Sequence, residues 1–255
     1  MSCIFLEGSA ELPASQGKGV IRMTCSGNRT PITGGDFEAA RYDMVARQIG
    51  GRGIRSPRVL AAMETVPRHL FVPDTLVREA YADEPLPIGE GQTISQPFMV
   101  AAMAEALALE GQEHVLEVGA GCGYQAAVLS RLVRDVIAVE TQPALAASAR
   151  ERLARLGYAN VRIEEGDGSA GWPAAAPYDA ILVTAAAPRV PQPLIDQLAE
   201  GARLVIPVGP AEHQDLLRIV KRDGRTTERS LYACRFVPLL GRYGWRQEAE
   251  EPNRR

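Results

Sequence analysis

Several carboxylates and glycines are spaced as in sites that bind a nucleotide-like ligand. The segment EVGAGCGYQ has three glycines at alternating positions, with a carboxylate two residues before the first of them. Glycines in such a turn let a ligand touch the backbone, and the first amides of a following helix offer free N–H donors. A second acid follows about 20 residues later, where a carboxylate usually accepts ribose hydroxyls. With the later GDGS segment, the candidate set is Glu117, Gly119, Gly121, Gly123, Glu140, Asp167 and Gly168.

The elements that must position this set alternate between short apolar strands and helices. We predict strands at 114–119, 135–140, 161–166, 179–184, 202–209, 216–223 and 229–239. The first five are short and apolar, as expected for strands buried on both faces. Helical stretches such as 143–157 separate the first four, which predicts an α/β fold with a doubly wound, mainly parallel, seven-stranded sheet. The last two strands lack a helix between them and are expected to form an antiparallel hairpin at the edge.

The predicted fold brings the candidate residues to one edge. In open α/β sheets, ligands bind outside the carboxyl ends of the strands. Taken singly, Glu140 can be explained as an acid that caps a helix, and Asp167 with Gly168 as a simple turn. The ordered set is harder to explain as coincidence, so we predict a ligand site there.

Glu117 helps to choose between two classes of ligand. A nicotinamide dinucleotide usually goes with a GxGxxG fingerprint, whereas the spacing here is GxGxG. A carboxylate just before the turn would repel a pyrophosphate. The same carboxylate suits a ligand with a cationic amine and a sulfonium and without a phosphate. S-Adenosylmethionine is therefore favoured, and NAD remains the alternative.

Composition excludes several classes of protein. The 255 residues carry a formal net charge of -3, without the basic field typical of proteins that wrap duplex nucleic acid. No apolar run approaches the roughly 20 residues needed to span a bilayer. The four cysteines are scattered, with neither a CxxC pair nor a histidine at zinc spacing. We expect a cytoplasmic protein with no metal, no nucleic-acid partner and no membrane contact.

The chain before the cofactor region divides into a leader, helices and a long connection. Residues 1–35 are rich in Gly, Ser, Thr and Pro, which predicts a disordered leader. We expect helices at 36–53, at 56–66 with Ser56 as the N-cap, and at 98–111, where Gly111 would end the helix. The connection 67–97 is expected to be irregular and functional. Residues 36–255 would form one domain, divided into 36–111, a cofactor-binding core at 112–240 and a tail at 241–255.

This connection carries the most specific motif of the chain. It contains Tyr81, Asp83 and then PLPIG and GQTISQP. The chain here resembles the protein-L-isoaspartate O-methyltransferase family, whose signature is YxDxPLPIGxGQTISQP. Further matches are MVARQIGGRGI, VLAAMETVPRHLFVP, VLEVGAGCGYQAAVL, GDGSAGWP, YDAILVTAAAP and RFVPL. The resemblance covers roughly residues 40–240, and it leaves out the leader and the tail.

The resemblance implies an activity, a substrate and a catalytic residue. Members transfer a methyl group from S-adenosylmethionine to the free α-carboxylate of L-isoaspartyl residues, which starts repair of damaged proteins through a succinimide. The implied Rossmann-like enzyme would act on damaged proteins and peptides, and we expect it to be a monomer. Ser95, in the TIS element, would orient the substrate carboxylate. From spacing alone, Ser95 is better explained as the N-cap of the next helix.

Three positions depart from common family residues, and two other functions stay open. Phe98 stands where relatives often have Tyr or His, Cys122 where they often have Ser or Thr, and Leu240 where some have a polar residue. Because fold does not fix function, a small-molecule O-methyltransferase remains an alternative. A non-catalytic adaptor that keeps the cofactor domain is another. The complete loop signature, with Ser95 and the glycine turn retained, weighs against both.

Overall fold

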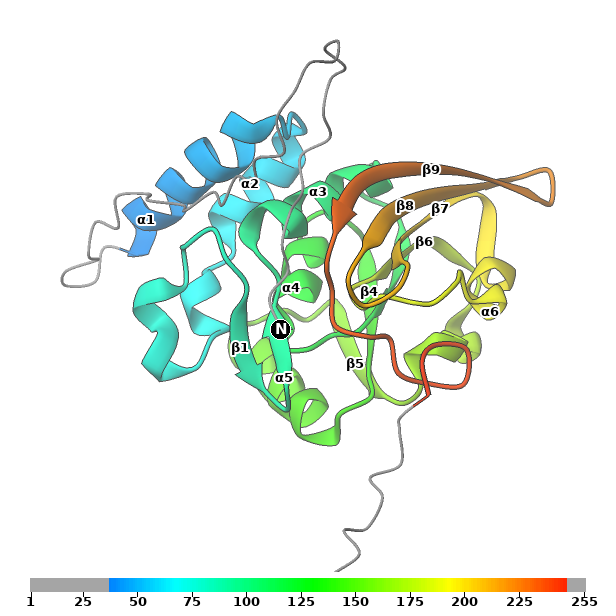
Figure 1. Cartoon of the computed structure of the whole chain (residues 1–255). Coiled ribbons are helices and arrows are strands. Elements are labelled where there is room, and N and C mark those ends of the chain that lie inside the picture. The colour runs from blue at the N-terminus through cyan, green and yellow to red at the C-terminus, as the bar shows by residue number, and fades with distance from the viewer. Residues whose placement is uncertain (1–36, 247–255) are drawn as a thin grey trace, which may run out of the picture.

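The computed structural model describes residues 37–246, in which seven strands form one sheet (Figure 1). Its order is β5-β4-β3-β6-β7-β8-β9. The strands are β3 (His114–Val118), β4 (Asp135–Glu140), β5 (Val161–Glu165), β6 (Tyr178–Val183), β7 (Leu198–Val208), β8 (Gln214–Arg222) and β9 (Arg225–Cys234). The strands β5, β4, β3, β6 and β7 are parallel, and β8 and β9 continue the sheet as antiparallel strands. This architecture and the antiparallel edge hairpin confirm the sequence prediction.

The central strands are buried on both faces, which explains their continuous apolar sequences. The face with Val115, Ala138 and Val205 shares a core with the N-terminal helices. The opposite face, with Leu116 and Ile206, packs against α6 and the turns before β6. The helices are α1 (Phe37–Asp43), α2 (Pro57–Thr65), α3 (Pro97–Leu107), α4 (Tyr124–Ser130), α5 (Pro143–Arg155) and α6 (Gln192–Asp196).

The first helical segment is not a uniform α-helix. After α1, the chain continues as a π-helical turn, Met44–Ile49, and a 3-10 turn, Gly50–Arg52, before Gly53 ends it at a φ of 104°. The expected cap of α2 is confirmed, because the Ser56 side chain accepts a hydrogen bond from the backbone N–H of Val59. Further 3-10 turns lie at Arg68–Leu70, Asp74–Glu79, Gly168–Ala170 and Pro173–Ala175.

The expected end of α3 at Gly111 is wrong. The helix ends at Leu107, and Ala108 takes the left-handed conformation with a φ of 49°. The backbone N–H of Ala108 donates to the Glu105 carbonyl, so the turn closes three residues before the glycine. The Glu105 carboxylate fixes this end of the helix to the start of α2 by accepting from the backbone N–H of Ser56 at 2.7 Å.

The connection before α3 is more regular than expected. It contains a small antiparallel hairpin of β1 (Leu86–Gly89) and β2 (Gln92–Ile94), in which Leu86 pairs with Ile94. Glu90 and Gly91, at the turn, both have positive φ, which suits a tight two-residue hairpin loop. In Figure 1 this hairpin lies in front of α4 and α5.

One hydrophobic core runs from Met44 to Phe236 and joins the N-terminal helices to the sheet. The single domain at 36–255 and its division at 111 and 240 stay predictions. The leader at 1–35 and the tail beyond 246 lie outside the described residues.

Candidate active site

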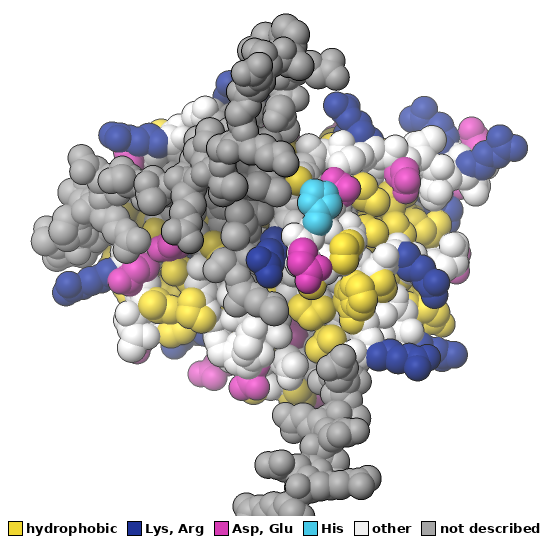
Figure 2. All heavy atoms as spheres, viewed as in Figure 1, with side chains coloured by type: hydrophobic (Ala, Val, Ile, Leu, Met, Phe, Trp, Pro, Cys, Tyr) yellow, Lys and Arg dark blue, Asp and Glu magenta, His cyan; other side chains and the backbone are white. Residues whose placement is uncertain are grey.

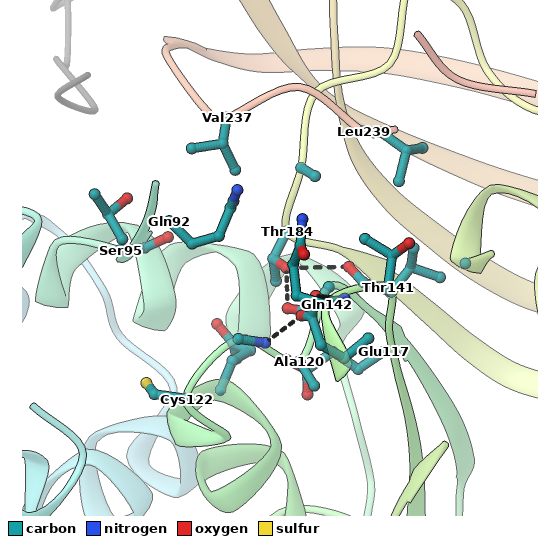
Figure 3. A pocket seen from close by; sticks show the side chains of 18 of the residues that line it. Gln92, Ser95, Glu117, Ala120, Cys122, Thr141, Gln142, Thr184, Val237 and Leu239 are labelled. Atoms are coloured by element: carbon teal, nitrogen blue, oxygen red, sulfur yellow. Dashed lines mark hydrogen bonds between the residues drawn. The ribbon is translucent and has the colours of Figure 1, made fainter. Parts of the chain in front are cut away.

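A cavity opens at the carboxyl ends of β3, β4 and β6, at the predicted edge of the sheet. Its floor is the turn after β3, and its walls are Glu140 to Gln142, the residues after β6, and the segments 92–95 and 237–240. Figure 3 shows Ser95 and Gln92 on one side of the cavity, Glu117 and Thr141 on the other, and Val237 and Leu239 above. The cavity thus joins the cofactor turn to the signature loop.

The three glycines of the turn are required by its backbone. Gly119, Gly121 and Gly123 have φ values of 95°, 53° and 86°, which side-chain-bearing residues rarely adopt. A Cβ on Gly119 would stand 2.5 Å from the hydroxyl of Thr184, which follows β6. That hydroxyl donates to the Gly119 carbonyl at 2.6 Å. The turn is therefore held against the neighbouring strand end, as ligand binding over it requires.

Glu117 is a buried carboxyl group without a hydrogen-bond partner among the described residues. It is 0% exposed, and neither of its carboxylate oxygens is bonded, although the side chain lines the cavity. Burial, together with the nearby charge of Glu140, raises the pKa of Glu117 well above its usual range. Burial therefore favours the protonated form more than in an exposed glutamate, and a cation bound in the cavity would favour the carboxylate.

Gln125 supplies a complementary group that the sequence did not indicate. It lies on α4, lines the same cavity and is 7% exposed. Its Nε2 is buried without an acceptor within residues 37–246. A glutamine on the first turn of a helix gives no particular sequence signal. The cavity therefore holds an unpaired donor as well as the unpaired acceptors of Glu117.

Glu140 ends β4 and faces the same space. One of its oxygens accepts from the backbone N–H of Gly121 at 2.7 Å, and the other accepts from the backbone N–H of Gln142 at 2.9 Å. The carboxylate thus fixes the glycine turn, and each oxygen retains a second lone pair. Glu140 is 5% exposed and lines the cavity.

The structure separates Asp167 from Gly168. Gly168 lines the cavity, and a Cβ there would stand 2.6 Å from Val118. Asp167 instead lines an adjoining hollow, which shares Thr141, Gln142 and Leu240 with the cavity. Its carboxylate accepts from the backbone N–H and hydroxyl of Ser169 and from the backbone N–H of Arg242. Asp167 therefore shapes the wall and does not reach the main cavity.

Ser95 lies at the cavity but does not cap the helix. It follows β2, and the N-cap of α3 is Gln96. The Ser95 side chain is half-buried and lines the cavity, and its hydroxyl forms no hydrogen bond with the described residues. The capping explanation is therefore wrong, and the hydroxyl is available to a ligand.

A carboxylate of the signature anchors the residue next to Ser95. Asp83 accepts from the Gln96 side-chain amide at 2.9 Å and pairs with Arg52 at 2.8 Å. These two contacts tie the end of the hairpin loop to the turn before α2. They explain why an aspartate and a glutamine, 13 residues apart, occur in the same motif.

The three departures from common family residues have simple surroundings. Phe98 lies under the Arg52 guanidinium, 3.9 Å from the ring centroid. Cys122 is buried, and burial raises the pKa of its thiol, which disfavours the reactive thiolate. Leu240 lines the cavity as an apolar wall. Cys122 and Leu240 line the cavity, Phe98 does not, and none of the three adds a charge to it.

Other cavity residues escaped the sequence analysis. Thr184 could have been found, because it follows β6 at the edge where ligands bind. Thr141 and Gln142 follow Glu140 and lack a motif of their own. Within residues 37–246 there is no cluster of three or more His, Cys, Asp or Glu side chains arranged to hold a metal. None of the helices described in this range is both long and apolar enough to cross a membrane.

Comparison with known proteins adds independent evidence. The family model of protein-L-isoaspartate(D-aspartate) O-methyltransferase matches residues 40–244. The protein-L-isoaspartate O-methyltransferase of Methanoculleus marisnigri is 57% identical over 208 residues, covering 82% of this chain and 94% of the relative. Protein-L-isoaspartate O-methyltransferase 1 of Rhodopseudomonas palustris is 52% identical, covering 90% of this chain and 96% of its own length.

Solved structures agree at the level of the fold. A protein-L-isoaspartate O-methyltransferase structure superposes with a TM-score of 0.71 at 30% identity, covering 80% of this chain and 67% of that one. A Plasmodium falciparum protein assigned to the same activity, in complex with S-adenosyl-L-homocysteine, gives a TM-score of 0.69 at 26% identity. It is matched over 78% of this chain and 98% of its own.

Proposed function

The chain belongs to the protein-L-isoaspartate(D-aspartate) O-methyltransferase family, and from this premise we propose how its residues carry out the reaction. The enzyme methylates the free α-carboxylate of L-isoaspartyl residues with S-adenosylmethionine. The ester carbonyl is attacked by the following backbone amide nitrogen and releases methanol, a far better leaving group than the oxide of a carboxylate. A succinimide re-forms, and part of it opens to normal aspartate. What remains to be assigned is the role of each cavity residue.

The unpaired groups of the cavity fit the amino-acid end of S-adenosylmethionine. This end carries an ammonium and a carboxylate. Glu117 offers two buried acceptors, and Gln125 offers one buried donor. A bound ammonium would supply the donors that Glu117 lacks and would favour its ionised form.

The ribose of S-adenosylmethionine would lie against Glu140, which can accept the ribose hydroxyls through its remaining lone pairs. Four glycines allow close approach of the ligand: Gly119, Gly121, Gly123 and Gly168. Asp167 would then support the cofactor wall through its backbone contacts.

Ser95 is proposed to orient the substrate. An isoaspartyl α-carboxylate has an ordinary pKa of about 4 and is ionised at neutral pH, so no strong base is needed. None of the described cavity residues is a histidine, which is consistent with a reaction that needs no strong base. The Ser95 hydroxyl would donate a hydrogen bond to one carboxylate oxygen and leave the other free to attack. Val237 and Leu239 would exclude water above the reacting groups (Figure 3).

When bound, S-adenosylmethionine would supply an electrophilic methyl carbon to the substrate oxygen, with the electron pair of the broken C–S bond going to sulfur. The protein's contribution is then to align the two reactants on opposite walls. Because positioning dominates such a transfer, small displacements of the Ser95 loop should have large effects on the rate. The observation that carries the proposal is the shared cavity of Ser95 and Glu117.

The test uses two peptides that are identical except for isoaspartate or aspartate at one position. Methyl transfer from labelled S-adenosylmethionine should occur only to the isoaspartyl peptide. The Ser95→Ala variant serves as the matched control, since it should bind S-adenosylmethionine normally and transfer slowly. If the native protein binds the cofactor and methylates neither peptide, the assigned substrate is wrong.

We also propose that the enzyme works as a cytoplasmic monomer and without nucleic acid. Its four scattered cysteines suit a reducing compartment, and its net charge of -3 does not favour general nucleic-acid binding. Sedimentation equilibrium at micromolar concentration should give the mass of one chain. A mass of two chains at that concentration would contradict the monomer.

A further inference from the structure

Five arginines lie on one face of the β7–β8–β9 edge, in a protein whose net charge is -3. Arg218 on β8 is directly opposite Arg229 on β9, and Arg222 is opposite Arg225. Arg203 on β7 pairs with Val220, which alternation places on the same face as Arg218 and Arg222. The arginine face is defined by these side chains: Arg203, Arg218, Arg222, Arg225 and Arg229.

These arginines repel one another, and no described acid pairs with any of them. Like charges directly opposite in a sheet are destabilising. None of the five forms an ion pair or a side-chain hydrogen bond with the described residues. The Nε atoms of Arg203 and Arg218 are buried without an acceptor in the same part of the chain. Burial, with the charges of Arg203 and Arg229, lowers the pKa of Arg218.

Two acidic residues near these arginines either bind backbone groups or lie on the opposite face of the hairpin. The Glu200 carboxylate accepts from the backbone N–H groups of Asp223 and Gly224 in the hairpin turn. Glu228 pairs with Ile219, which places it on the opposite face of the hairpin. In Figure 2, basic side chains gather with acidic ones at the upper right, where Figure 1 shows the tip of the β8–β9 hairpin. Within residues 37–246, none of these acids forms an ion pair with the arginine face.

The arginine face is connected to the active site by β9 itself. Tyr232, on the same face as Arg229, contacts the Phe98 ring at the start of α3 with a centroid distance of 5.8 Å. Val237, eight residues after Arg229, lines the cavity. Because β9 ends at Cys234, eight residues separate the two places by at most about 25 Å, and a substrate segment of roughly eight residues is long enough to connect them.

From these observations, we propose that the arginine face binds acidic stretches of the polypeptide substrate about six to ten residues from the isoaspartyl residue. The proposal rests on the proposed function, because it assumes a polypeptide in the cavity. Carboxylates supply the acceptors that the guanidinium groups lack, and they relieve the repulsion across β8 and β9. Binding at a distance suits a repair enzyme, since it adds affinity without restricting the residues next to the damage.

The test compares two isoaspartyl peptides of equal length. One has four Glu about eight residues from the isoaspartate, and the other has four Gln there. The variant R222Q/R225Q/R229Q removes three exposed charges of the arginine face. The matched control R47Q/R78Q/R155Q removes three exposed arginines from other parts of the structure and changes the net charge equally. Both are assayed for KM and kcat at low and high salt.

The native enzyme should have a KM about fivefold lower for the Glu peptide at low salt, and high salt should abolish the difference. The control variant should retain this preference, and R222Q/R225Q/R229Q should lose it with kcat unchanged. Equal KM values for both peptides in the native enzyme would overturn the proposal. So would an arginine-dependent affinity for single-stranded RNA without a preference for the Glu peptide. Methylation of a short isoaspartyl peptide tests the proposed function separately, because such a peptide does not reach the arginine face.

Discussion

Replacing Glu117 by Gln should stabilise the cofactor-free protein and weaken cofactor binding. The side chain is fully buried, and neither oxygen has a partner in the described structure. Without ligand, its ionised form is therefore unfavourable, and glutamine is a neutral side chain of the same shape. With ligand, the same carboxylate is proposed to meet an ammonium, and glutamine removes that charge. The two effects have opposite signs and arise from one atom group.

The magnitude on binding follows from the loss of a hydrogen bond to a charged group. Such bonds contribute about 1.5–3 kcal/mol, so the Kd for S-adenosylmethionine should rise by roughly 10- to 150-fold. Isothermal titration calorimetry measures this directly. The product S-adenosylhomocysteine keeps the ammonium and should lose affinity to a similar degree.

The effect on stability depends on pH, and its sign is fixed by the raised pKa of Glu117. Between the ordinary pKa of the unfolded chain and the raised value in the fold, the native state binds the extra proton. Stability therefore falls as pH rises through this window, by up to about 1.4 kcal/mol per pH unit. The Glu117→Gln variant does not lose stability in this way. The difference in the free energy of unfolding between the variant and the native protein should therefore grow with pH.

Urea unfolding of the cofactor-free native and variant proteins, at intervals from pH 5 to pH 8, tests the stability prediction. A constant difference across that range would refute the argument from burial. An unchanged Kd for S-adenosylmethionine would refute the contact with the ammonium. Glu113→Gln is a suitable control, because burial of Glu113 is outweighed by hydrogen bonds from backbone N–H groups, and its pKa is lowered.

Three further predictions concern the two walls of the cavity. Ser95→Ala should lower kcat by roughly 10- to 100-fold, from the loss of one hydrogen bond to a charged group, while the Kd for S-adenosylmethionine stays unchanged; equal turnover would remove Ser95 from the mechanism. Glu140→Ala should weaken S-adenosylmethionine binding by about 1–3 kcal/mol, and an unchanged Kd by calorimetry would contradict the ribose assignment. Asp83→Asn should lower kcat/KM about fivefold at constant cofactor Kd, since it weakens the contacts that hold Gln96 beside Ser95. A double change of Asp83 and Gln96 should then be less than additive.

The sheet could be predicted because its sequence pattern reflects its burial. Each central strand is short, apolar and bounded by a turn, so the order of elements fixed the fold class. The proximity of the glycine turn and Glu140 could also be predicted, because the ends of parallel strands lie at one edge of the sheet. In the structure, the backbone N–H of Gly119 donates to the carbonyl of Val139 on β4. These features depend on local pattern and on a general rule of topology.

The features that escaped prediction depend on contacts between distant residues. Asp167 accepts a hydrogen bond from the backbone N–H of Arg242, 75 residues away, and nothing near GDGS in the sequence indicates this contact. The early end of α3 depends on Ala108 adopting a left-handed conformation, although Gly111 is the better local candidate. Gln125 acquires its importance only because the folded chain leaves its amide unpaired in the cavity.

The arrangement of the cavity separates cofactor binding from substrate positioning. Glu117, Gln125 and Glu140 come from the sheet and from α4, whereas Ser95 comes from a hairpin loop that Asp83 anchors. A change in the sheet wall should therefore alter cofactor Kd, and a change in the loop wall should alter turnover. This separation suits an enzyme with a constant cofactor and a variable polypeptide substrate. The cofactor wall can be rigid and fully buried, while the substrate wall holds one common feature, the α-carboxylate, and leaves the flanking chain to weaker contacts.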